Sequence, residues 1–256
     1  MTGRDEARPQ LRVFSDLEQL ARGAADQFVR RTTAGWGGDR PTAVALSGGS
    51  TPKRMFELLA EDPYCDQVPW ERIHFFWGDE RTVPPDHPDS NFGAANQALL
   101  SGLELPAGNL HRIQAELDDP GLAAVSYEHE LRRFFGLAEE EMPRFDLVFL
   151  GMGADGHTAS LFPGTDALGE KRRLAVATWV AKLAAHRVSL TCPVFNNAAC
   201  ILFLVSGAEK AETLRQVLEG SPEPHRYPAQ LIRPQNGELL WYMDEAAAQR
   251  LQRRGP

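Results

Sequence analysis

The chain has 256 residues, of which 43% are hydrophobic and 24% charged, and a formal net charge of −8. These values fit a globular protein with one large core, so we expect a single domain over residues 1–256. The acidic charge argues against nucleic acid as a partner, because a phosphate backbone requires a basic face. No apolar run reaches the ~18 residues that span a bilayer, and no N-terminal signal segment is present, so we expect a cytoplasmic protein with no membrane partner. Three scattered cysteines fit free thiols in a reducing compartment.

Short apolar runs alternate with helical patterns along the chain. The predicted strands are 42–46, 73–77, 146–150, 175–179, 187–191, 200–205 and 238–243. Several, such as FDLVFL and CILFLV, are apolar at every position, which is typical of strands covered by helices on both faces. The pattern predicts an α/β fold with a mostly parallel, doubly wound sheet and helices on both faces.

The helix ends are also readable. Asp119 and Pro120 predict the start of a helix that runs to Phe135 and ends at Gly136. Ser206 and Glu209 have the spacing of a capping box for a helix over 208–218. Further expected features are a helix from Ser90 and Asn91 to about Leu100, a last helix capped by Asp244, and loops at 35–41 and 220–228.

Ligands of such sheets bind where loops leave the carboxyl ends of the strands. The first such loop contains Ser47, Gly48, Gly49, Ser50 and Thr51, followed by a helix. The glycines allow close approach to a ligand, and the helix N-terminus offers unpaired N–H groups to an anion. The pattern therefore favours phosphate binding, although an ordinary turn with Ser50 as a helix cap would look the same.

The second loop begins with Asp79, Glu80 and Arg81, directly after a buried strand. The planar guanidinium of Arg81 suits an anionic oxygen. The alternative is a structural ion-pair network among the three residues. A metal site at Asp86, His87 and Asp89 is disfavoured, because prolines interrupt the segment and no second cluster lies nearby.

The third loop, GMGADGHTASLFPGT, places Asp155 and His157 among three glycines. A lone histidine is usually structural, but this setting favours a general base, with Asp155 orienting the ring. We expect a short helical turn over 158–162 before Pro163 stops it; a helix N-terminus there would favour the neutral imidazole. The same proline argues against a dinucleotide site, although the glycines match its letters. Further along, Lys182 and Arg187 could reach an anion, unless they are simply solvated.

Together, the segments LSGGSTPKRMFELL, FFWGDERTVPPDHPDSNFGAA, FDLVFLGMGADGHTASLFPGT and K-x4-R-V-S-L-T resemble the 6-phosphogluconolactonase family, in the family's order, over about residues 46–197. The resemblance implies a Rossmann-like fold, no cofactor and no metal, a sugar-phosphate lactone as substrate, and a monomer or small homo-oligomer. It implies hydrolysis of the lactone, the second step of the oxidative pentose phosphate pathway, by water that His157 activates and Asp155 helps to orient.

The same resemblance assigns the 6-phosphate to Arg81, Lys182, Arg187 and the loop 47–51, with Asp79 and Glu80 beside them. The oxyanion stabiliser stays open between backbone N–H groups of 48–50 and of 151–153. Two alternatives are a glucosamine-6-phosphate deaminase and a non-catalytic sugar-phosphate-binding protein. The deaminase core continues into a segment resembling IAFNEP, whereas this chain continues TASLFP.

Overall fold

A computed structural model describes residues 9–33 and 40–252. Its main feature is a sheet in which every recorded strand pair is parallel, in the order β1-β10-β9-β6-β2-β3-β5. The strands are β1 (Gln10–Phe14), β2 (Thr42–Leu46), β3 (Ile73–Trp77), β5 (Leu110–His111), β6 (Leu147–Gly151), β9 (Cys200–Val205) and β10 (Glu238–Asp244). The predicted mostly parallel α/β sheet is confirmed.

The order of the strands reverses between β2 and β6. From β2 the chain proceeds outward through β3 to β5, whereas from β6 it proceeds the other way through β9 to β10. At such a switch point the connecting loops diverge and leave a crevice outside the carboxyl ends of the strands. The fold therefore places the loops after β2 and β6 on either side of one crevice.

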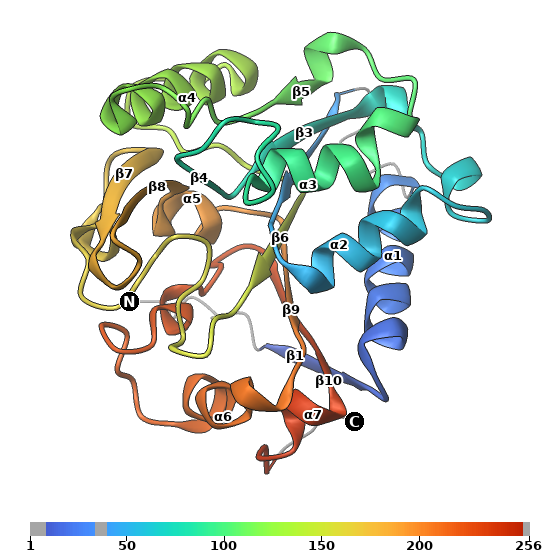
Figure 1. Cartoon of the computed structure of the whole chain (residues 1–256), viewed down its shortest axis with the longest axis vertical. Helices are drawn as coiled ribbons and strands as arrows, with labels where there is room; N and C mark the ends of the chain where they lie inside the picture. Colours follow the sequence, from blue (N-terminus) through green and yellow to red (C-terminus); the bar gives the residue numbers. More distant parts are fainter. Residues whose placement is uncertain (1–8, 34–39, 253–256) are drawn as a thin grey trace.

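Helices cover both faces of this sheet. They are α1 (Leu17–Thr33), α2 (Ser50–Leu59), α3 (Asn91–Ala98), α4 (Pro120–Phe135), α5 (Cys192–Asn196), α6 (Ala211–Glu219) and α7 (Glu245–Ala248). In Figure 1, α1 and α2 lie on one side of the sheet, and α4 and α5 lie on the other. This arrangement explains why β2 and β9 are buried at every position. No described helix is long and apolar enough to cross a membrane.

Several predicted helix ends are confirmed. The side chain of Asp119 accepts a hydrogen bond from the amide of Gly121 at the start of α4, and Gly136 ends that helix in the left-handed conformation (φ 63°). Ser90 caps α3 and Asp244 caps α7. The loop predicted at 220–228 is present, whereas most of the loop predicted at 35–41 lies outside the described residues.

A second, smaller sheet was not anticipated. The strands β4 (Asp79–Arg81), β8 (Ala185–Leu190) and β7 (Ala175–Val180) pair antiparallel in the order β4-β8-β7. The segments 175–179 and 187–191 are strands as predicted, but they do not join the parallel sheet. A tight connection, the 3₁₀ turn Ala181–Leu183 followed by Ala184 at φ 47°, returns the chain on itself and pairs β7 with β8 as a hairpin.

Two local expectations were wrong. Residues 158–162 form a turn closed by a bridge between Thr158 and Leu161, not a helical turn. The hydroxyl of Thr158 donates to the carbonyl of Gly151 (2.8 Å), and Ala159 has φ 47°, which a right-handed helical turn does not allow. The capping box at Ser206 is also absent, because that hydroxyl donates to Asp244 and the helix α6 begins only at Ala211.

Candidate active site

A cavity of about 210 Å³ lies at the switch point of the large sheet. Its walls come from the segments that follow four neighbouring strands, β2, β3, β6 and β9. The side chains and backbone that line it include Ser47, Gly48, Gly49, Ser50, Thr51, Asp79, Arg81, Asn91, Gly153, His157 and Lys210. Three of the four loops selected from the sequence thus meet in one place.

The segment 47–51 contributes backbone to this cavity. Gly49 is the residue before α2, it has φ 113°, and no side chain caps the helix, so Ser50 is not a capping residue. A Cβ on Gly48 would lie 1.8 Å from Oδ1 of Asn91, which explains why only glycine fits. Within the described part of the chain, no hydrogen bond is recorded for the amides of 48–51, and they lie at the positive end of the α2 dipole.

Asp79 and Arg81 lie on the same face of β4, since side chains alternate along a strand. The buried carboxylate of Asp79 accepts hydrogen bonds from Nδ2 of Asn91 (3.2 Å) and from Oγ of Ser160 (2.6 Å). The guanidinium of Arg81 donates to the carbonyl of Asp89 (2.7 Å). Asp79 therefore organises the wall, and Arg81 is available to an anion in the cavity.

Glu80 is placed differently from its neighbours. It is 2% exposed and is absent from the described cavity lining. Its carboxylate accepts the amides of Asn91 (2.7 Å) and Phe92 (2.8 Å) at the start of α3. Burial raises the pKa of Glu80, although these N–H donors act in the opposite direction. Its environment matches a structural anchor for α3 more than a substrate ligand.

The candidate catalytic pair, His157 and Asp155, lies in the loop after β6. Nδ1 of His157 lies 2.5 Å from Oδ1 of Asp155, and the backbone amide of His157 also donates to that oxygen (3.2 Å). Two glycines make this turn possible: Gly156 has φ 79°, and a Cβ on Gly153 would lie 2.0 Å from Cε1 of His157. Because no helix begins at 158, the expected helix dipole does not act on this histidine. Orientation of the ring comes from Asp155.

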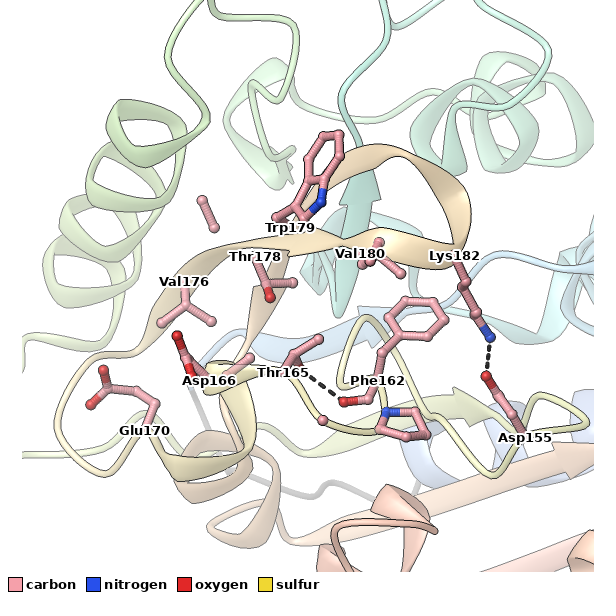
Figure 2. A pocket seen from close by; sticks show the side chains of 15 residues that line it. Asp155, Phe162, Thr165, Asp166, Glu170, Val176, Thr178, Trp179, Val180 and Lys182 are labelled. Carbon is pink, nitrogen blue, oxygen red and sulfur yellow. Dashed lines mark hydrogen bonds and ion pairs between the residues drawn. The ribbon is translucent and has the colours of Figure 1, made fainter.

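An aromatic ring and a lysine complete the surroundings of the pair. The imidazole of His157 stacks on Phe162 with ring centroids 4.1 Å apart. Nζ of Lys182 pairs with Oδ2 of Asp155, as Figure 2 shows. Partial burial acts to raise the pKa of Asp155, but hydrogen bonds from His157 and Lys182 outweigh it and hold that pKa well below its usual range. These contacts favour the ionised form of the carboxylate.

The two cations predicted to reach the phosphate, Lys182 and Arg187, are absent from the described lining of the His157 cavity. Arg187 is paired across the small sheet with Arg81. Burial lowers the pKa of Arg187, and the neighbouring charge of Arg81 lowers it further. Two guanidinium groups directly opposite one another repel, so this pair would gain from an anion. Phosphate binding by Lys182 and Arg187 stays a prediction.

Sequence reasoning missed Lys210, which lines the cavity. The residue ends the 3₁₀ turn Ala208–Lys210 after β9, in the segment where the sequence predicts a capping box. The segment after β9 could have been predicted to reach the site. The strand β9 is buried, and its carboxyl end lies at the same edge of the sheet as those of β2, β3 and β6. The amide of Gly153, by contrast, donates to the carbonyl of His157 (2.9 Å) and cannot serve as an oxyanion donor.

Neither a metal cluster nor a nucleotide site is found in the part of the chain that the structure describes. No group of three or more His, Cys, Asp or Glu side chains there is placed to hold a metal ion. The glycines at 151–156 are followed by a turn and then the 3₁₀ helix Asp166–Gly169, not by the α-helix that a dinucleotide site needs.

Comparison with known proteins agrees with this geometry. The sequence profile of the family described as glucosamine-6-phosphate isomerases/6-phosphogluconolactonase matches residues 15–241. A 6-phosphogluconolactonase of a Nostoc species is 46% identical over 208 residues, covering 81% of this chain and 84% of the relative. One from a Synechocystis species is 41% identical over 243 residues, covering 95% and 98%.

Among solved structures, the 6-phosphogluconolactonase from Trypanosoma cruzi superposes with a TM-score of 0.86 at 28% identity, covering 98% of this chain and all of that one. The family match spans most of the chain, and the match covers 84% or more of each of these relatives. The chain therefore belongs to the glucosamine-6-phosphate isomerase/6-phosphogluconolactonase family.

Proposed function

We propose that this chain is a 6-phosphogluconolactonase, which hydrolyses 6-phospho-D-glucono-1,5-lactone to 6-phospho-D-gluconate. The observation that carries the proposal is that one cavity holds both His157, whose Nδ1 is hydrogen-bonded to Asp155, and an anion cradle made of the N-terminus of α2, Arg81 and Lys210. The names of the relatives support the same reaction.

In the proposed mechanism His157 acts as general base. Asp155 accepts a hydrogen bond from Nδ1–H of His157, which leaves the lone pair on Nε2, and among the described residues no partner of Nε2 is recorded. Nε2 removes a proton from water as the water oxygen attacks the lactone carbonyl. Collapse of the tetrahedral intermediate breaks the bond to the ring oxygen, which takes the proton from the imidazolium.

The phosphate is assigned to the other side of the cavity. The free amides of 49–51 and the α2 dipole favour an anion, and Arg81 and Lys210 supply two positive charges. Binding the phosphate fixes the distance from the lactone carbonyl to His157, and such positioning lowers the barrier beyond what the base provides.

The reaction needs no metal, since a δ-lactone is an activated ester and a general base typically contributes about 10²–10⁴-fold. The test is to add purified protein to freshly generated 6-phosphogluconolactone, with and without a chelator, and to follow formation of 6-phosphogluconate. We expect acceleration over spontaneous hydrolysis that the chelator does not remove. Ammonia release from glucosamine 6-phosphate, or binding of sugar phosphates with no turnover, would contradict the proposal.

A further inference from the structure

A second cavity, of about 790 Å³, adjoins the first on the other side of the catalytic pair. Its walls are the loop 162–167 and the strand β7, and it is closed at one end by Asp155 and Lys182. In Figure 2, Val176, Thr178 and Val180 point into this space, whereas Trp179 points away from it. Because Asp155 lines this cavity and His157 lines the other, the hydrogen bond between them crosses the wall between the two.

Lys182 reaches this wall from the tip of the β7–β8 hairpin and makes two contacts there. Its ammonium pairs with Oδ2 of Asp155, the oxygen that does not face His157. The same ammonium lies 4.7 Å from the centre of the Phe162 ring, and the imidazole of His157 stacks on that ring as well. The lysine thus touches both groups that determine where the histidine ring lies.

These contacts differ from those of a phosphate ligand. A lysine that binds the substrate phosphate would line the substrate cavity, as Lys210 does. Lys182 lines only the second cavity, and its charge is already matched by a carboxylate. With Nδ1 and the amide of His157 on one oxygen and Lys182 on the other, the carboxylate of Asp155 is fixed in plane and kept ionised, which is what orienting a catalytic histidine requires.

We propose that Lys182 is a positioning residue for the His157–Asp155 pair, acting through Asp155 and Phe162, and that it is not a ligand of the substrate phosphate. This inference rests on the proposed lactonase function. The ammonium holds Oδ2, so that Oδ1 stays directed at Nδ1 of the histidine. Phe162 then limits rotation of the imidazole out of the stacked plane.

Charged residues of both signs surround the His157–Asp155 pair. The charged residues that line the two cavities around it are Asp79, Arg81, Lys210, Asp166, Glu170 and Lys182. Of these, Lys182 is the one in direct contact with the pair. Removing its positive charge favours the protonated, inactive state of the pair, so activity should begin to fall at a higher pH as the solution is acidified.

The experiment compares Lys182→Met and Lys182→Arg with the wild-type chain. For Lys182→Met we expect kcat to fall about tenfold or more, KM to change less than threefold, and the acid limb of the pH profile of kcat/KM to move up by about half a pH unit. Lys182→Arg should restore most of kcat and the wild-type acid limb. Affinity for 6-phosphogluconate, measured by calorimetry, should be unchanged in both. Lys171→Met, an exposed lysine outside both cavities, is the matched control.

The inference is overturned if Lys182→Met weakens 6-phosphogluconate binding tenfold while kcat and the acid limb stay at wild-type values, because that is the behaviour of a phosphate ligand. It is also overturned if Lys182→Arg fails to restore kcat while remaining folded by thermal melting. Failure of the proposed function looks different, since the wild-type chain itself would then leave the lactone untouched.

Discussion

The loops that follow β2 and β6 face each other across the switch point of the sheet, and they are built in opposite ways. The loop at 47–51 presents backbone amides and the end of a helix, and carries no charged side chain. The loop at 152–157 uses its backbone to hold itself together, through the bond from Gly153 to the His157 carbonyl, and presents an acid–base pair. We infer that the first loop binds substrate and that the second performs the chemistry, so substitutions in the two should affect KM and kcat separately.

The largest expected effect comes from removing the base. His157→Gln keeps a polar side chain of similar size but cannot accept a proton from water, so kcat should fall about 10²–10⁴-fold with little change in KM. Initial rates on fresh lactone, corrected for spontaneous hydrolysis, measure this change. His129→Gln, at an exposed position on α4, is the control. A His157→Gln enzyme with near wild-type kcat would assign the chemistry to another group.

The glycines of the two loops give the sharpest comparison. In Gly153→Ala the new methyl would meet Cε1 of His157 at 2.0 Å and displace the base, so kcat should fall at least tenfold. In Gly48→Ala it would meet Oδ1 of Asn91 at 1.8 Å and disturb the cradle, so KM should rise by a similar factor.

Gly108→Ala, where a Cβ meets nothing within 4 Å, controls for the substitution itself. Steady-state kinetics on all three variants distinguish the two outcomes. If both Gly48→Ala and Gly153→Ala changed only KM, or only kcat, the division of roles between the loops would be wrong.

A smaller effect is expected at Lys210. Lys210→Met removes one of the two cavity cations assigned to the phosphate, so KM for the lactone and Kd for 6-phosphogluconate should rise about tenfold, with kcat within threefold of wild type. Calorimetric titration with 6-phosphogluconate measures the loss directly. Unchanged affinity would remove Lys210 from the cradle.

The smallest effect on activity is expected for a substitution at Tyr127, which is absent from the described lining of the His157 cavity. The hydroxyl of Tyr127 accepts from the amide of Trp77 (2.9 Å) and donates to its carbonyl (3.0 Å), directly before Gly78. Tyr127→Phe leaves both buried groups unpaired and should lower the free energy of unfolding by about 1–3 kcal/mol. Urea denaturation measures the change. We expect kcat and KM to stay at wild-type values, and a change in either would show that the scaffold and the site are coupled.

A strand could be predicted from the sequence where a continuous apolar run marks it. The strands 42–46, 73–77 and 200–205 were predicted with the observed bounds, because each is a run of buried side chains that one sequence window contains. The strand β4 could not be found this way. Asp79, Glu80 and Arg81 form a strand only because β8 supplies its pairing partner about a hundred residues later.

The candidate site shows the same difference between local patterns and contacts between distant segments. Glycine and helix-start patterns are local, so the loops at 47–51 and 153–157 could be predicted from their own residues. Which loops share a cavity depends on strand order, and that is decided by packing between distant segments. This is why Lys210 was missed, and why the contact between Lys182 and Asp155 was not predicted.

A crystal structure of the chain with bound 6-phosphogluconate would test the division of roles most directly. We predict the phosphate against the amides of 49–51, between Arg81 and Lys210, and the C1 carboxylate within hydrogen-bond distance of Nε2 of His157. Lys182 should still pair with Asp155. A phosphate bound by Lys182, with His157 remote from C1, would contradict both the assignment of the cradle and the proposed mechanism.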